Sequence, residues 1–390
     1  MSTTAETNDG ADKVAGTAAG PGAAERKYDG PLLSVDNVST RFRTKRGWLH
    51  AVDGVSLTLE AGETLGLVGE SGSGKSVLGK TAMGLISGDN ATHITGEVRF
   101  AGHDMQAITR KQQRELWGDD IAMIFQDPMS ALNPLKHIGT QLTESIRVHM
   151  GLDKKQARER AVELLRKVRI PEPARRIDQY PHELSGGMRQ RVVIAIALAC
   201  DPTLVIADEP TTALDVTVQK QILDLLDDLR HEMGMASILV SHDLGVVAGQ
   251  TDRVAVMYAG RVVEMAPTKQ LFSSPRHPYT TALLAAIPDL GDAPHTPLES
   301  IDGGLPDMTK PIPGCAFADR CRYAQERCLT EAPALDVAKD ADGEPGADPK
   351  HPHRVACHFP VGTPEGDAAL AANEKAGRTA AGRELKLEAV

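Results

Sequence analysis

The most constraining feature of the sequence is a glycine-rich segment between an apolar run and a helical pattern. Residues 69–76 read GESGSGKS and fit the pattern GxxxxGK[ST], directly after the strand-like run 64–68. In such a loop, glycines let backbone N–H groups curl around phosphate oxygens, and the following helix start adds partial positive charge. An ordinary glycine-rich turn is the alternative. The strand–loop–helix context favours a phosphate site in an α/β fold.

The motif predicts roles for residues of the loop, above all for its lysine and its final serine. Lys75 would reach the β- and γ-phosphates of a nucleotide, and the Ser76 hydroxyl would bind Mg²⁺. The residues expected to contact the nucleotide here are Ser71, Gly72, Ser73, Gly74, Lys75, Ser76 and Val77.

A second strand-like run, Leu204–Ala207, ends in two carboxylates, Asp208 and Glu209. Because ligands of α/β sheets bind at the carboxyl ends of strands, both acids should face the nucleotide. Asp208 would hold Mg²⁺ through water, and Glu209 would orient the attacking water as general base. A core strand with an acidic end is the alternative for this run taken alone.

The segment Leu184–Arg191 reads LSGGMRQR and contains Ser185, Gly186 and Gly187 before a helix. This pattern predicts a second anion-binding helix start. One chain has no need of two such sites for one γ-phosphate, but two chains do if each offers its Ser-Gly-Gly to the other's nucleotide. The alternative is a simple serine N-cap.

With these motifs, residues 33–290 resemble the ATPase subunits of ATP-binding cassette (ABC) transporters. The resemblance implies a P-loop NTPase of ABC type, with ATP and Mg²⁺ as ligands. It implies that Gln126 touches Mg²⁺ and the attacking water, and that His242 contacts the γ-phosphate and Glu209. It further implies that Asp215, in the segment Ala213–Asp215, lies across a dimer interface. The remaining residues that it places at the nucleotide are Ser185, Gly186, Gly187 and Gln190 for the signature segment, and Phe42 for adenine stacking, with Trp48 and His50 as alternatives to Phe42.

Three further segments resemble oligopeptide and dipeptide importers: Phe125–Pro134, Tyr180–Glu183 and Ser274–Thr280. The last contains His277-Pro278-Tyr279, which alone is also typical of a helix cap with a surface aromatic. The resemblance implies two permease subunits, an extracytoplasmic peptide-binding protein and a second ATPase, identical or homologous. A nickel or other small-solute importer is the near alternative, and a soluble, non-transport ABC ATPase is the distant one.

Four of the five cysteines lie close together near the C-terminal end: Cys315, Cys321, Cys328 and Cys357. Their spacing, C-x5-C-x6-C-x28-C, matches neither a usual zinc ribbon nor a ferredoxin. Thiolates favour Zn²⁺ or an iron–sulfur cluster, and free buried thiols are the third option. The resemblance to the peptide-importer extension implies a [4Fe–4S] cluster. A redox sensor that gates transport is a further hypothesis.

Charge and composition set the remaining expectations. The formal net charge of −10 argues against nucleic-acid binding, which needs a basic surface. The longest apolar run, Val192–Cys200, is too short to span a bilayer. We therefore expect a cytosolic protein, peripheral on the cytoplasmic side of the membrane.

The expected divisions are a disordered tail (1–30), an ABC ATPase domain (31–285) with a helical subdomain (about 128–185), a cysteine-bearing extension (286–360) and a flexible tail (361–390). A frayed helix is the alternative for the last of these segments.

Overall fold

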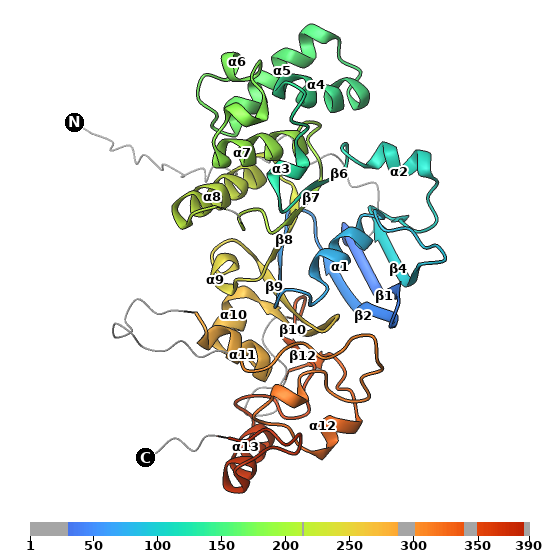
Figure 1. Ribbon diagram of the computed structural model, residues 1–390, viewed down its shortest axis with the longest axis vertical. Coiled ribbons are helices and arrows are strands. Elements are labelled where there is room, and N and C mark those ends of the chain that lie inside the picture. Colours follow the sequence, from blue (N-terminus) through green and yellow to red (C-terminus); the bar gives the residue numbers. More distant parts are fainter. Residues whose placement is uncertain (1–29, 213, 288–300, 339–348, 386–390) are drawn as a thin grey trace, which may run out of the picture.

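The computed structural model describes residues 30–212, 214–287, 301–338 and 349–385. Two sheets form its centre, with a group of helices at one end and the C-terminal extension at the other (Figure 1). The α/β P-loop fold expected from the sequence is confirmed. The expected N-terminal tail, apart from residue 30, lies outside the described residues.

The larger sheet has eight strands in the order β11-β12-β10-β9-β3-β8-β7-β6. The five neighbouring strands β9, β3, β8, β7 and β6 run parallel to one another. Each is short and almost wholly buried, as expected for strands covered on both faces of a sheet. Their carboxyl ends therefore meet at one edge of the sheet, where the functional loops begin. These strands are β3 (Thr64–Val68), β6 (Ile121–Ile124), β7 (Leu204–Asp208), β8 (Ala236–Ser241) and β9 (Arg253–Tyr258).

The smaller sheet is antiparallel, in the order β2-β1-β4-β5. Its buried face and that of the larger sheet share one hydrophobic core, which includes Leu33, Leu78, Phe100 and Ile206. Leu78 belongs to helix α1 (Lys75–Ala82), so the helix that follows the glycine-rich loop is held between the sheets. The strands are β1 (Leu33–Thr44), β2 (Gly47–Leu59), β4 (Thr92–Phe100) and β5 (His103–Asp104).

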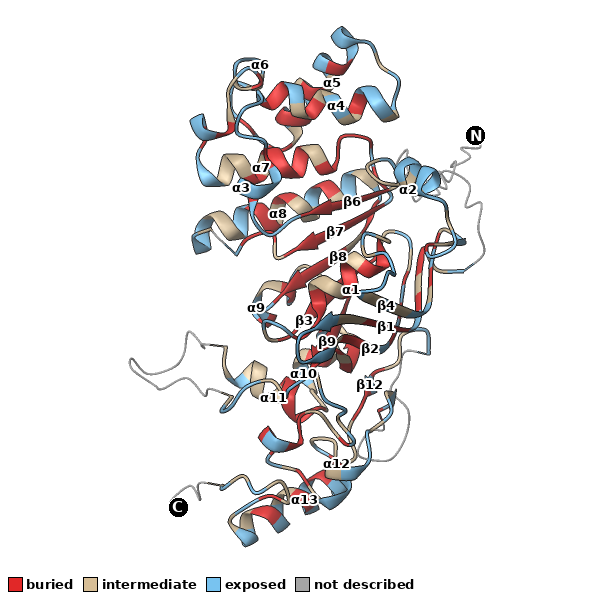
Figure 2. Cartoon of the chain, turned by 45° about the vertical axis from the view of Figure 1, so that its right-hand side comes forward, coloured by how far each residue is buried: buried red, intermediate tan, exposed pale blue. Residues whose placement is uncertain are grey.

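Helices dominate the segment between β6 and β7, and their buried faces point at one another (Figure 2). In α5, for example, Asp153 caps the helix, and Ala157, Ala161 and Leu165 form its fully buried face. The elements here and just before β6 are α2 (Arg110–Leu116), α3 (Pro128–Ala131), α4 (Ile138–His149), α5 (Lys154–Lys167), α6 (Pro173–Arg176), η1 (Pro181–Glu183) and α7 (Gly186–Ala197). Helices α8 (Val216–Met233) and α9 (Leu244–Val247) follow β7 and β8.

The C-terminal extension is joined to the larger sheet. Strand β12 pairs antiparallel with β10, so the extension adds its own strand to the edge of the cassette. At this junction the wholly buried carboxylate of Glu264 accepts hydrogen bonds from the backbone N–H groups of Arg276 and His277 and lies 2.7 Å from His353 Nε2. The elements are β10 (Arg261–Pro267), α10 (Thr268–Ser273), α11 (Pro278–Ala285), η2 (Ala318–Arg320), α12 (Glu326–Thr330), β11 (Asp336–Val337), β12 (Arg354–Val355) and α13 (Pro364–Ala376).

Residues 361–385 differ from the flexible tail that composition predicted. They contain helix α13, which Thr363 caps by accepting a hydrogen bond from the Gly366 N–H. The amide of buried Asn373 donates to the carbonyl oxygens of Arg322 and Ala324, so the helix is fixed to the extension. The helix agrees with the alanine-rich composition, because alanine is the strongest helix former.

Candidate functional site

The glycine-rich loop has the geometry of a phosphate cradle. It leaves β3 at Val68 and ends at Gly74, the N-cap of α1, whose φ is +103°. A Cβ on Gly74 would lie 2.2 Å from the carbonyl oxygen of Ala51, so no other residue fits there without a shift of the backbone. The Ser73 side chain is fully buried, and its hydroxyl has no hydrogen-bond partner among the described residues.

Lys75 lies inside this loop. Its ammonium group donates to the carbonyl oxygens of Gly69 (2.7 Å) and Glu70 (3.0 Å). Burial lowers the pKa of Lys75, although Glu209, Asp208 and Glu70 act in the opposite direction. The arrangement holds a cation within the curl of the loop, where phosphate oxygens would be bound.

Ser76 and Asp208 meet across the edge of the sheet. The Ser76 hydroxyl donates to Asp208 Oδ1 over 2.6 Å, although 132 residues separate them in the sequence. Hydroxyl and carboxylate oxygens are the ligands that Mg²⁺ prefers, and the cation is usually held by few protein groups plus substrate phosphates. The donor set fits Mg²⁺.

Glu209 is the centre of a second cluster. Its Oε2 accepts hydrogen bonds from Gln126 Nε2 (3.0 Å) and from the Thr212 hydroxyl (2.8 Å), and it lies 3.2 Å from His242 Nδ1. The structure therefore brings together Gln126, Glu209 and His242, which come from three different loops. Sequence reasoning missed Thr212; its position three residues after Glu209, at the same strand end, was the available signal.

The signature segment and Asp215 stand apart from this cluster. Ser185 caps α7 by accepting from the Met188 N–H, and Asp215 caps α8 by accepting from the Val218 N–H. Both residues are exposed, and among the described residues no hydrogen bond links either of them to the phosphate loop. Gly186 and Gly187 open α7, and Gln190 is buried in the same helix. Its amide nitrogen has no hydrogen-bond partner in the part of the chain that the structure describes. Ala213 lies outside the described residues.

The three adenine-stacking candidates lie on one hairpin. Phe42 pairs with Leu49 across the β1–β2 ladder and is half-buried, whereas Trp48 is exposed and its ring lies against His93. The His50 N–H donates to the Met308 carbonyl oxygen of the extension. None of these contacts favours one of the three residues for adenine stacking, so the assignment of Phe42 stays a prediction.

The four clustered cysteines line one small cavity, called here the cysteine cavity, together with His277, Phe317 and Phe359. None of the thiols forms a disulfide. Burial raises the pKa of Cys315 to about 11 and that of Cys357 to about 12, and it also raises the pKa values of Cys321 and Cys328. Gly314 permits this convergence, because a Cβ there would lie 2.1 Å from the Cys328 carbonyl oxygen. The donor set suits a thiophilic metal, although the described residues contain no group of three side chains placed as metal ligands.

The histidines near Cys357 have other partners. His353 is buried against Glu264, and His358 Nε2 lies 2.9 Å from the Glu331 carbonyl oxygen. His277, expected to cap a helix, accepts from the Tyr279 N–H, and burial lowers its pKa to about 4. The helix cap expected here is therefore present, but Tyr279 is wholly buried, so the expectation of a surface aromatic is wrong.

The fold, the phosphate loop and the carboxylates at the ends of the parallel strands define an ATPase of the ABC class. A model of the ABC transporter family matches residues 52–212, and one described as the oligopeptide/dipeptide transporter C-terminal region matches residues 263–328. A solved ATP-binding cassette, dimeric in a post-hydrolysis state with ADP and Pi, aligns with a TM-score of 0.55 at 28% identity. The alignment covers 61% of this chain and 99% of the chain in that structure.

Named relatives are more similar in sequence. A putative peptide import ATP-binding protein of Brucella abortus is 52% identical over 307 residues, 79% of this chain and 92% of the relative. The dipeptide transport ATP-binding protein DppD of Escherichia coli is 47% identical over 331 residues, 85% of this chain and 97% of the relative. The chain belongs to the family of ATP-binding subunits of peptide ABC transporters. No helix in the described ranges has the length and apolarity needed to cross a bilayer.

Proposed function

We propose that this chain hydrolyses ATP to drive the import of di- and oligopeptides through an ABC transporter. The observation that carries the proposal is that one chain joins two features. The Ser76–Asp208 and Gln126–Glu209 pairs lie beside the phosphate loop, and the region after them matches the oligopeptide/dipeptide transporter C-terminal model. Lys75 and the loop backbone would hold the phosphates, Ser76 and Asp208 would hold Mg²⁺, and Glu209 would orient the attacking water.

The proposed working unit contains two ATPase subunits. Ser185 and Asp215 are exposed and stand apart from the catalytic cluster of their own chain, which favours a role against a nucleotide bound to a second subunit. Each ATP would be closed between the phosphate loop of one subunit and the helix start of α7 of the other. Hydrolysis would then reopen the pair. The second subunit is an identical or homologous ATPase.

The surface following Gln126 is the proposed contact with the permeases. Phe125, Met129 and Leu135 are exposed there, and Leu135 is 85% accessible. Large apolar side chains exposed next to the catalytic cluster suit a short cytoplasmic helix of a membrane partner. In this arrangement the chain sits peripherally on the cytoplasmic side of the membrane, under two permease subunits that receive peptide from an extracytoplasmic binding protein.

The proposal is tested by reconstituting the chain with its permeases, binding protein and partner ATPase in lipid nanodiscs. Addition of a di- and oligopeptide mixture is expected to stimulate ATP hydrolysis, whereas Ni²⁺ is not. The same complex carrying Glu209→Gln serves as the control for background hydrolysis. Stimulation by Ni²⁺ alone would reassign the substrate, and failure of the chain to assemble with any permease would favour a soluble ATPase.

We further infer that the cysteine cavity holds a [4Fe–4S] cluster. Four thiols from three separate segments line one cavity. Three of them, Cys315, Cys321 and Cys328, lie in the region that matches the oligopeptide/dipeptide transporter C-terminal model, and Cys357 follows it. Burial opposes ionisation of each thiol, so a cation among them would supply the charge that keeps thiolates buried. The cluster would bind the segments around Cys315, Cys328 and Cys357 to one another.

Iron and acid-labile sulfide in protein purified without oxygen decide this inference. We expect near-stoichiometric cluster content with a broad absorbance near 400 nm, and loss of both in Cys321→Ser. Cys200→Ser is the matched control, because Cys200 is a core thiol outside the cavity. Zinc in place of iron, or folded, colourless and metal-free protein that still hydrolyses ATP, would overturn the inference.

A further inference from the structure

Glu70 in the phosphate loop is bonded through each of its polar groups. Its backbone carbonyl oxygen accepts from Lys75 Nζ (3.0 Å) and from the Ser73 N–H (3.1 Å). Its backbone N–H donates to the Tyr279 hydroxyl over 2.8 Å. Both of its carboxylate oxygens accept from Arg320, each over 2.9 Å. One residue of the loop therefore touches the phosphate-binding lysine on one side and the C-terminal region on the other.

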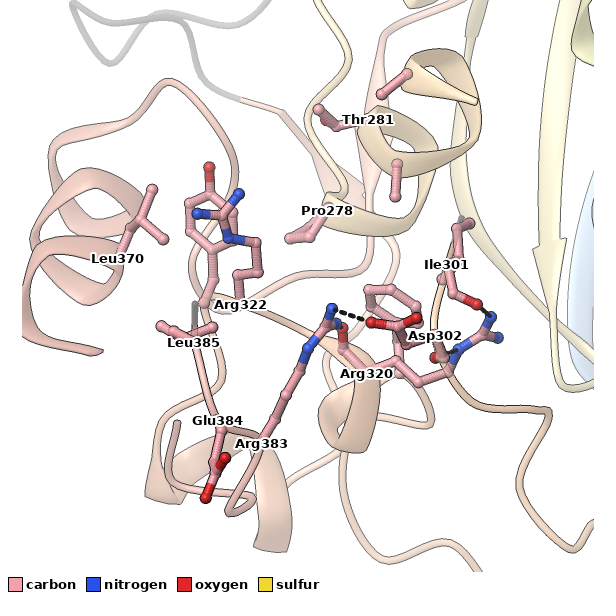
Figure 3. Close-up of a pocket in the computed structure, with 14 residues that line it drawn as sticks. Pro278, Thr281, Ile301, Asp302, Arg320, Arg322, Leu370, Arg383, Glu384 and Leu385 are labelled. Atoms are coloured by element: carbon pink, nitrogen blue, oxygen red, sulfur yellow. Dashed lines mark hydrogen bonds and ion pairs between the residues drawn. The ribbon is translucent and has the colours of Figure 1, made fainter. Parts of the chain in front are cut away.

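Arg320 is built to hold that carboxylate in one orientation. The pair is bidentate, which fixes geometry as well as charge, and the arginine side chain is only 6% exposed. Two other guanidinium donors reach the carbonyl oxygens of Ile301 and Asp302, at 2.9 Å each (Figure 3). A further donor reaches the Tyr258 hydroxyl of β9 over 3.2 Å. The guanidinium also lies over the rings of Tyr258 and Phe317. Arg320 is therefore held both by the extension and by Tyr258 of β9 while it donates to Glu70.

Two other contacts join the extension region to the same loop. Tyr279 of α11 is wholly buried and packs against Tyr258 and Phe317 while its hydroxyl accepts from Glu70. Leu305 stands against Gly72, where a Cβ would be 3.4 Å from its side chain. The loop is thus supported at three points by residues that follow β10 in the chain: a charge pair, a hydrogen bond and an apolar contact.

We propose that Arg320 and Tyr279 position Glu70, so that the C-terminal extension sets the affinity of the phosphate loop for ATP. The three are positioning residues, because they would act through the loop backbone and Lys75. The proposal rests on the proposed phosphate-binding role of this loop. It assigns the extension a part in nucleotide binding, and it gives the buried tyrosine of His277-Pro278-Tyr279 a specific task.

A double-mutant cycle tests the Arg320–Glu70 arm. Arg320→Met keeps the length of the stem and removes the donors, and Glu70→Gln keeps the shape and removes the charge. In the full-length chain, each variant is expected to raise the Kd for ATP on the order of tenfold. The double variant should raise it by about the same factor instead of by the product. Turnover at saturating ATP should stay within about twofold of wild type, since lost ground-state binding raises KM alone.

The matched control is Arg322→Met. Arg322 lies two residues away and pairs with Glu374 inside the extension, so its loss should leave the Kd for ATP unchanged. Lys75→Ala distinguishes the failure of the positioning proposal from the failure of the proposed function. If Lys75→Ala still binds ATP, the proposed phosphate-binding role of the loop is wrong. If Lys75→Ala abolishes binding, three results would overturn the positioning role alone. The first is a Kd for ATP in Glu70→Gln equal to that of the wild type. The second is a Kd in the double variant raised by the product of the two single effects. The third is a loss of turnover in either single variant without a change in its Kd for ATP.

Discussion

Replacing Glu209 by glutamine is expected to slow ATP turnover by about 10²–10⁴-fold while ATP still binds. Glutamine keeps the shape of the side chain and its contacts with Gln126 and Thr212, which meet Glu209 Oε2 at 3.0 and 2.8 Å. It loses the carboxylate that would take the proton of the attacking water. Phosphate release and ATP affinity, measured on the same purified protein, check the result.

The control for the loss of one negative charge is Glu172→Gln. Glu172 is exposed on the helical subdomain and pairs only with Arg175 among the described ion pairs, so this variant should turn over ATP normally. Unchanged turnover of pure Glu209→Gln would remove Glu209 from the mechanism. Equal losses in both variants would point to a general effect of surface charge.

Replacing Ser185 by arginine is expected to reduce hydrolysis by about 10²–10³-fold, the usual effect of losing a donor to developing charge. ATP binding to the isolated chain should be unaffected. Ser185 is exposed at the start of α7, with no hydrogen bond to the phosphate loop within the described residues, so a long cation there would obstruct a second subunit. Equilibrium ATP binding to the monomer and turnover of the assembled transporter are the two measurements.

Ser87→Arg is the matched substitution for this experiment. Ser87 is also exposed, but it lies in the loop after α1 and belongs to neither α7 nor α8. It should change neither ATP binding nor turnover. If Ser185→Arg abolished ATP binding in the monomer, the signature segment would act on the nucleotide of its own chain, and the proposed two-subunit site would be wrong.

Local pattern was enough to predict the catalytic part of the molecule. The runs ending at Val68 and Asp208 became β3 and β7, because short apolar segments between helices have few alternatives to a buried parallel strand. The order of parallel strands then places Lys75, Asp208 and Glu209 at one edge. Gln126 and His242 follow β6 and β8, whose carboxyl ends lie at the same edge of the sheet as that of β7. Their side chains therefore reach Glu209, at 3.0 Å and 3.2 Å.

Long-range partnerships could not be predicted in the same way. Arg320 and Glu70 are 250 residues apart, and nothing in the spacing of either residue indicates the other. For residues 361–390 the sequence indicated at most a frayed helix, because the segment has little apolar periodicity. Packing of small residues against the extension fixes α13 in place. Thr212 was not singled out from the sequence, because its contact with Glu209 depends on the path of the chain after that residue.

The edge-strand pairing of β12 with β10 also bears on how the chain is made. Glu264 and its partner His353 are 89 residues apart, and β10 gains its outer neighbour only when residues 354–355 have been synthesised. At typical elongation rates of about 5–20 residues per second, this interval is roughly 4–18 s. During it, a nascent cassette exposes an open sheet edge and an acidic side chain destined for the interior. Chaperone capture of the ribosome-bound chain therefore has a defined time window, which closes when His353 leaves the ribosome.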